Sequence, residues 1–86
     1  MSKLEKLIAS LLADSGEYPF SDTKKVLSKF GFLEVRIRGS HHTFRHEDGR
    51  IQVIPVKHRK TVKKSYVKET VELLKLKEWY EQRKGN

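Results

Sequence analysis

The sequence predicts an α+β fold in which a three-stranded antiparallel sheet packs against helices. Apolar residues recur at helical spacing in the first thirty residues and again in the last third of the chain, whereas apolar and polar residues alternate between these two regions. Two turn signals, Gly39-Ser40 and Asp48-Gly49, divide the alternating region into three strands. At 86 residues, the chain is expected to form one small domain.

The first predicted helix runs from Lys3 to Ala13. Ser2 and Glu5 have the spacing of a capping box, and Gly16 is the expected end of the apolar run. The stripe consists of Leu4, Leu7, Ile8, Leu11 and Leu12. Such a stripe is more typical of a core-facing helix than of a membrane anchor, because the polar face carries both charge signs.

Two further helices are predicted, one on each side of the strands. The first lies within residues 21–32, with Ser21 or Asp22 as its N-cap and Gly31 as its stop. The second is expected to be capped by Ser65. Its stripe contains Val67, Val71 and Leu74, widened by Leu73, Leu76, Trp79 and Tyr80. The segment "EYPF" is interpreted as a short turn and "EQRKGN" as a frayed tail.

The strand register follows from the two turns. Gly39-Ser40 suits a two-residue type II′ hairpin and Asp48-Gly49 a type I′ hairpin, so Arg38 is expected opposite His41. The same register puts Phe44 opposite Val35 in one hairpin and opposite Val53 in the other. The face expected to pack on the helices then contains Leu33, Val35, Ile37, Phe44, Ile51 and Val53. The open face contains Arg36, Arg38, His41, Thr43, Arg45 and Gln52.

Strand alternation also bears on the three clustered histidines. His41 and His42 are neighbours and point to opposite faces, His41 to the basic open face and His42 toward the core. His46 shares a face with His42 but lies roughly 13 Å from it at about 3.3 Å per residue. Zinc ligands converge to about 2 Å from one ion, and the chain has no cysteine, so no metal site is predicted.

Composition favours an anionic partner. The formal net charge of +8 makes nucleic acid the first candidate and an acidic protein the second, although a lysine-rich surface can also be merely solubilising. The absence of cysteine fits a reducing compartment, and no apolar run reaches the ~18 residues that span a membrane. We therefore expect a cytoplasmic protein without a membrane segment, with no room for a large cofactor.

A basic run precedes the last helix. It contains Lys57, His58, Lys60, Lys63 and Lys64. Lysines just ahead of a helix amino terminus can grip phosphate, because the free N–H groups and the helix dipole favour anions. A solvated loop is the alternative interpretation.

The ordered set Gly31-Phe32, Gly39-Ser40-His41, Phe44, Asp48-Gly49 and Ile54-Pro55-Val56 resembles the HicA family of bacterial toxins over roughly residues 21–75. The resemblance implies a double-stranded-RNA-binding-like fold, with helices on one face of the sheet. It also implies metal-independent and cofactor-independent cleavage of messenger RNA, and a HicB-like antitoxin as partner, the toxin being a monomer or bound to the antitoxin. The implied catalytic residue is the histidine after Gly-Ser, here His41.

The chain departs from the family pattern in two places. Residues 1–20 form an N-terminal helical extension to a core of residues 21–80, followed by the short tail. Where many members have histidine directly after Pro-Val, this chain has Lys57 and then His58, so no catalytic role is carried over to His58.

Metal-free RNA cleavage needs groups that move protons at the 2′-OH and at the leaving 5′-oxygen. His41 can do part of this work near neutral pH, with Arg38 and Arg45 as phosphate contacts, but no second proton-transfer residue is evident. The candidate RNA-binding residues are Arg36, Arg38, Ser40, Thr43, Arg45, Lys57, His58, Lys60, Lys63 and Lys64. The same residues also suit a non-catalytic RNA-binding module, an adaptor for an acidic protein, or a solvated face.

Overall fold

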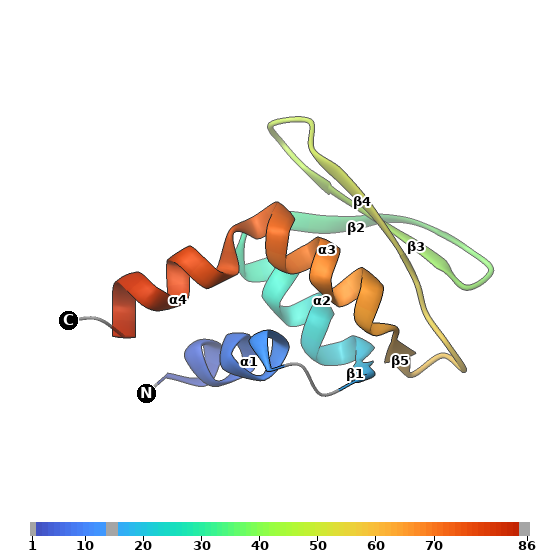
Figure 1. Cartoon of the computed structure of the whole chain (residues 1–86). Helices are drawn as coiled ribbons and strands as arrows, with labels where there is room; N and C mark the ends of the chain where they lie inside the picture. Colours follow the sequence, from blue (N-terminus) through green and yellow to red (C-terminus); the bar gives the residue numbers. More distant parts are fainter. Residues whose placement is uncertain (1, 14–15, 85–86) are drawn as a thin grey trace.

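The computed structural model describes residues 2–13 and 16–84 of the chain (Figure 1). Its elements are α1 (Lys3–Leu12), β1 (Tyr18–Pro19), α2 (Phe20–Lys29), β2 (Phe32–Arg38), β3 (His41–His46), β4 (Ile51–Pro55), β5 (Thr61–Val62), α3 (Lys64–Leu74) and α4 (Leu76–Lys84). Strands β2, β3 and β4 form an antiparallel sheet in that order. The predicted α+β class is confirmed, and the arrangement is consistent with a double-stranded-RNA-binding-like fold. No helix in the described part of the chain is long and apolar enough to cross a membrane.

The helices lie on one side of the three-stranded sheet and leave its other side uncovered (Figure 1). Helices α2 and α3 lie next to the sheet, and α1 and α4 lie beyond them. The core between these layers consists of Ile8, Leu11, Tyr18, Val26, Leu27, Phe32, Phe44, Ile54, Val56, Val62, Val67, Leu74 and Leu76. We call the uncovered side the outer face and the helix-covered side the inner face.

Helix α1 begins as predicted. The Ser2 hydroxyl accepts a hydrogen bond from the Glu5 backbone at 3.1 Å, and the Glu5 carboxylate accepts one from the Ser2 backbone at 3.2 Å, which completes the capping box. The helix ends at Leu12, before the expected stop at Gly16. Its buried residues, Ile8 and Leu11, pack against α2, α3 and α4.

The predicted N-caps of α2 and α3 were wrong. Pro19 caps α2 in place of Ser21 or Asp22, and Lys63 caps α3 in place of Ser65, neither with a side-chain hydrogen bond. Helix α2 follows β1 directly, and α3 follows β5 after Lys63. Strands β1 and β5 pair with each other and form a two-stranded sheet. The segment interpreted as a turn is therefore partly strand, and this long-range pairing sets both helix starts.

The predicted last helix is divided in two. Lys75 adopts a left-handed conformation, with φ of 52°, and ends α3. Helix α4 then continues to Lys84, so residues 81–84 are helical where a frayed tail was expected, and residues 85–86 lie outside the described residues. The break lets α4 turn beside α1. The ring of Trp79 in α4 packs against the ring of Phe30 at the end of α2, with 5.9 Å between the ring centroids.

The predicted register holds near the first turn and fails away from it. Arg38 lies opposite His41 as expected, but a bulge between Glu34 and Arg36 puts Phe44 opposite Glu34, not Val35. The second loop spans three residues, because the His46 backbone N–H donates to the Arg50 carbonyl at 2.9 Å. The type I′ turn at Asp48-Gly49 was therefore wrong. Each irregularity shifts the pairing by one residue and so exchanges the two faces.

The predicted inner face was consequently wrong for most of its members. Phe44 is buried, but Leu33, Val35, Ile51 and Val53 are 64%, 57%, 57% and 44% exposed. The inner face instead buries Phe32, Phe44, Gln52 and Ile54. Gln52, expected on the open face, accepts a hydrogen bond from the Thr70 hydroxyl at 3.0 Å. Both faces of the sheet carry apolar residues, so alternation alone could not decide which face was buried.

Gly31 shows why glycine is needed at the end of α2. Its φ is +88°, and a Cβ at this position would lie 2.8 Å from Nε2 of His46. The His46 ring packs on Phe32 at a centroid distance of 5.1 Å. The predicted stop at Gly31 is confirmed, and its cause is both the backbone conformation and the close approach of β3.

Candidate functional site

The hairpin between β2 and β3 has the predicted two-residue turn. Gly39 has φ of +60°, whereas Ser40 has no positive φ, as a type II′ turn requires. The Ser40 carbonyl accepts a hydrogen bond from the Val56 backbone at 2.7 Å. This bond holds the hairpin beside the chain that leaves β4, so the turn and residues 56–59 lie together.

His42 lies on the inner face, as predicted, and is fixed by a carboxylate. Its Nδ1 atom lies 2.7 Å from Oε2 of Glu34, and Oε1 of Glu34 accepts a hydrogen bond from Nζ of Lys24 at 3.2 Å. The side chains of His42 and Glu34 are only 17% and 16% exposed. The ring of Phe20 packs on the imidazole at a centroid distance of 4.5 Å. Helix α2 and the sheet therefore both restrict the orientation of His42.

The chemistry of the Glu34–His42 pair selects one imidazole tautomer. Burial raises the pKa of Glu34, but hydrogen bonds from His42 and Lys24 outweigh it and lower that pKa below its ordinary value of 4.5. Glu34 is ionised at neutral pH and can only accept, so Nδ1 of His42 carries the hydrogen. Nε2 is then the nitrogen that can accept or deliver a proton.

The chain bends sharply next to this pair. His58 and Arg59 both have positive φ, 52° and 62°, at the two central positions of a turn closed by a 3.0 Å hydrogen bond from the Lys60 backbone to the Lys57 carbonyl. Non-glycine residues adopt this conformation at a cost of roughly 1 kcal/mol or more each. The Phe20 backbone donates to the Lys60 carbonyl at 2.7 Å, which fastens the turn to the start of α2.

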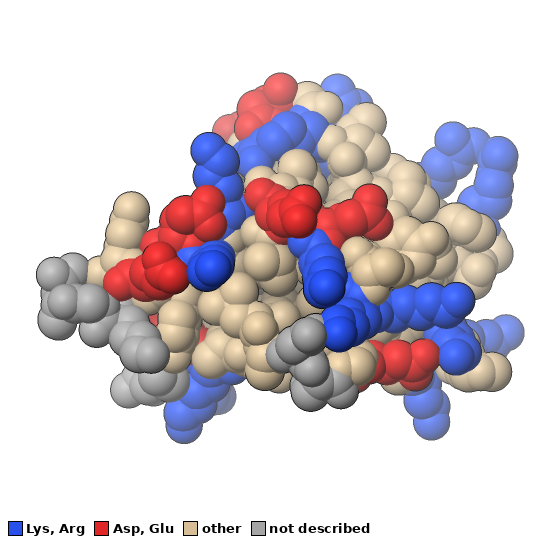
Figure 2. All heavy atoms as spheres, viewed as in Figure 1, with Lys and Arg blue, Asp and Glu red and all other residues tan. Residues whose placement is uncertain are grey.

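These segments enclose a shallow pocket between the hairpin and the 57–60 turn. It is lined by Phe20, Ile37, Gly39, Ser40, His42, Val56, His58 and Arg59. We call it the histidine pocket. It brings together two imidazoles, a guanidinium and a hydroxyl, which are groups that transfer protons and bind phosphate oxygens. Lysine and arginine side chains project from this end of the molecule, whereas acidic residues gather over α3 and α4 (Figure 2).

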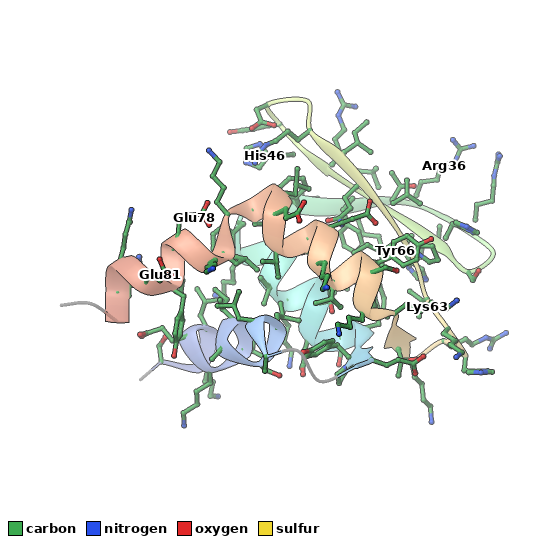
Figure 3. All side chains as sticks on the ribbon, viewed as in Figure 1. Arg36, His46, Lys63, Tyr66, Glu78 and Glu81 are labelled. Atoms are coloured by element: carbon green, nitrogen blue, oxygen red, sulfur yellow. The ribbon has the colours of Figure 1, made fainter. Side chains whose placement is uncertain are left out.

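The predicted site residues do not form one cluster. His41 is exposed on the outer face, with Arg38 opposite it in the pairing register as predicted. The other outer-face candidates are Arg36, Thr43 and Arg45. Figure 3 shows Arg36 extending away from the helices, whereas His46 lies on the helix side. The sheet thus separates the candidates on the outer face from those that line the histidine pocket.

The candidates that follow β4 divide again. Ser40 and His58 line the histidine pocket. Lys57 forms an ion pair with Glu17 at 3.1 Å, which reduces its availability for phosphate. Lys60 is exposed in the turn, and Lys63 and Lys64 occupy the N-cap and first position of α3, as the phosphate-gripping hypothesis required.

Sequence reasoning missed His42 and Arg59 as site residues, and it missed Glu34 as the partner of His42. The alternation did place His42 toward the helices, but no local pattern connects it with Glu34, eight residues earlier. Within residues 2–13 and 16–84 there is no group of three or more His, Cys, Asp or Glu side chains that could hold a metal ion.

Comparison with known proteins shows the family of the chain. A family model described as "HicA toxin of bacterial toxin-antitoxin" matches residues 20–76, which is more than half of the chain. Searches of curated proteins and of solved structures gave no significant match. The matched region begins at the first residue of α2 and includes the whole histidine pocket.

Proposed function

Because the chain belongs to the HicA family of toxins from bacterial toxin–antitoxin pairs, we propose that it cleaves messenger RNA at the histidine pocket and thereby inhibits translation. The observation that carries this proposal is the Glu34–His42 pair, whose 2.7 Å contact fixes an imidazole at the edge of a pocket that also contains His58 and Arg59. A largely buried carboxylate that accepts a hydrogen bond from a histidine ring, and so orients it beside a second imidazole and a guanidinium, is an arrangement suited to proton transfer.

The reaction we propose needs no metal or cofactor. The ribose 2′-oxygen attacks phosphorus, and Nε2 of His42 takes the 2′-OH proton as that P–O bond forms. The bond from phosphorus to the 5′-oxygen breaks, and the leaving oxygen receives a proton. His58, which lines the same pocket, is the candidate donor. The products are a 2′,3′-cyclic phosphate and a 5′-hydroxyl, so atoms and charge balance.

Arg59 and Ser40 have supporting roles in this proposal. The Arg59 guanidinium, held beside the pocket by its strained turn, offsets the charge that builds on the phosphate oxygens. The Ser40 hydroxyl lies at the pocket edge and can donate to the same group. The lysines of the 57–64 segment extend the positive surface along which RNA approaches.

The family resemblance assigns catalysis to His41, and the pocket favours His42. The two side chains lie on opposite faces of the sheet and cannot both reach one phosphate. His41 is exposed, whereas His42 has an orienting carboxylate and a packed ring. A general base loses efficiency when its ring is free to rotate, so we place the proton transfer on His42.

The test compares His41→Ala, His42→Ala and His58→Ala with the wild type on a defined unstructured RNA, with and without a chelator. The wild type is expected to cleave in both conditions and to leave a cyclic phosphate. His42→Ala should lower the rate by about 10²- to 10⁴-fold, and His41→Ala should have a much smaller effect. The reverse ranking would return catalysis to His41, and binding without products from the wild type would replace the enzyme with an RNA-binding module.

A further inference from the structure

The turn that carries His58 and Arg59 holds two groups of the histidine pocket in a strained conformation. Both residues are exposed and have positive φ, 52° and 62°. Backbone hydrogen bonds join Lys57 to Lys60 and Thr61 at 2.7–3.0 Å, but an exposed turn of this kind opens easily. Non-glycine residues keep a left-handed conformation only where the surrounding structure holds them in it. Contacts from outside the turn are therefore expected to decide how well it stays in place.

The segment just before α2 supplies such contacts. Tyr18 pairs with Val62 and Pro19 pairs with Thr61, so β1 lies along the end of the turn (Figure 1). The side chains of Tyr18 and Val62 are only 4% and 0% exposed, which anchors this pairing in the core. The position of Glu17, next to Tyr18 in the chain, is thereby fixed beside the turn.

The Glu17 carboxylate contacts both ends of the turn. Its Oε2 atom lies 3.1 Å from Nζ of Lys57, and its Oε1 atom accepts a hydrogen bond from the Thr61 hydroxyl at 3.5 Å. Hydrogen bonding and charge attraction from Lys57 lower the pKa of Glu17 below its ordinary value of 4.5. Glu17 is therefore ionised at neutral pH and can hold the two ends together.

From these contacts we infer that Glu17 is a positioning residue, which keeps His58 and Arg59 at the histidine pocket by bridging the two ends of their turn. The inference rests on the proposed function, because that function gives His58 and Arg59 their parts in RNA cleavage. Glu17 lies outside the lining of the pocket and acts through the turn. It also precedes residues 20–76, which the family model matches, so this support comes from the N-terminal extension.

The effect of Glu17 is expected to be local. The side chains of Glu17 and Lys57 are 45% and 46% exposed, and an exposed ion pair contributes little to global stability. Without the bridge, the turn should be correctly closed in a smaller fraction of the molecules. Because the displaced groups act in the transition state, the loss should appear in kcat. Removal of a negative charge beside the basic segment should by itself favour RNA binding, so KM should not rise.

The test uses the full chain and a defined unstructured RNA. Glu17→Lys places a second cation beside Lys57 and should lower kcat at least about tenfold without raising KM. Exchange of the two charges, Glu17→Lys with Lys57→Glu, restores an ion pair and should recover most of the kcat that Glu17→Lys loses. Glu69→Lys makes the same change in net charge at an exposed position of α3 and should keep the wild-type kcat.

Hydrogen exchange tests the turn without RNA. The Lys60 amide donates to the Lys57 carbonyl, and the Phe20 amide donates to the Lys60 carbonyl. Both amides should exchange at least about tenfold faster in Glu17→Lys than in the wild type. Protected amides of the three-stranded sheet should keep their wild-type rates, which shows that the variant is folded.

The outcomes separate the inference from the proposed function. Unchanged exchange of the turn amides in Glu17→Lys would overturn the inference, as would a loss of kcat that the exchanged pair does not recover. Faster exchange with an unchanged kcat would overturn it too, because the position of the turn would then not limit cleavage. A wild type that binds the RNA without cleaving it would refute the proposed function, and the exchange rates would still decide whether Glu17 holds the turn.

Discussion

Glu34 and His42 are joined by a 2.7 Å contact although neither lies opposite the other in the sheet. Glu34 is paired with Phe44, and His42 is paired with Ile37. The bulge between Glu34 and Arg36 bends β2 and changes the direction of its side chains, which allows the carboxylate to reach along the sheet to the imidazole. A regular strand pairing would have separated the two groups.

Replacement of Glu34 by Gln tests whether the carboxylate orients His42. The neutral amide can either accept from Nδ1 or donate to it, so the selected tautomer is lost in part of the molecules. The kcat for a defined RNA is expected to fall at least about tenfold while KM changes little. Glu47→Gln, which removes an exposed carboxylate from the neighbouring turn, is the control. An unchanged kcat in Glu34→Gln would assign Glu34 a purely structural role.

The same substitution should change acid stability. The pKa of Glu34 is lowered in the folded protein, so the unfolded chain binds this proton more tightly. The stabilisation is therefore present above the ordinary pKa of 4.5 and is lost as pH falls through the lower folded value. Urea unfolding at pH 7 and at acidic pH should show a smaller acid-induced loss of unfolding free energy for Glu34→Gln than for the wild type. Equal acid-induced losses of unfolding free energy in the two proteins would show that the charge of Glu34 adds no stability.

Gly31→Ala separates a steric effect from a backbone effect. Gly31 and Gly49 have φ of +88° and +98°, but only the Cβ at position 31 meets His46, at 2.8 Å. Gly49→Ala should lower the free energy of unfolding by about 1 kcal/mol, and Gly31→Ala by about 2–3 kcal/mol. Adding His46→Ala should remove the excess cost at position 31 relative to His46→Ala alone. Equal costs at the two glycines, measured by denaturant unfolding, would contradict the close approach.

Gln52 is buried, and we expect its amide group to contribute little to the free energy of unfolding. Its Nε2 atom has no hydrogen-bond partner among the described residues, and the Thr70 hydroxyl can also donate to the Tyr66 carbonyl at 3.1 Å. Gln52→Met keeps the shape and removes the unsatisfied donor. Its free energy of unfolding should equal that of the wild type or exceed it by about 1 kcal/mol, whereas Gln52→Ala should be destabilised. A loss of more than about 1 kcal/mol in Gln52→Met would show that Nε2 is satisfied in solution.

Much of the fold is readable from short-range patterns. The Ser2–Glu5 capping box, the stop at Gly31 and the turn at Gly39-Ser40 depend on residues within a few positions of one another, and the structure confirms each. The failures depend on distant residues. The caps of α2 and α3 were wrong because the pairing of β1 with β5, more than forty residues apart, sets where those helices begin.

The candidate site shows the same division. The direction of His42 toward the helices followed from alternation, and the pairing of Arg38 with His41 followed from the two-residue turn at Gly39-Ser40. The convergence of Glu34, His42 and His58 did not, because it requires a bulge, a hydrogen bond from Val56 to Ser40 and a strained turn that leave no local signature.

The sequence by itself determined the α+β class, the family, the basic character of the surface and the two opposite directions of His41 and His42. Only the tertiary structure decided which sheet face is buried. Both faces carry apolar side chains, and a single-residue shift in register exchanges them, so the choice depends on where the helices bury the larger rings of Phe32 and Phe44. That choice places His42 beside Glu34 on the inner face and leaves four aliphatic residues exposed on the other face.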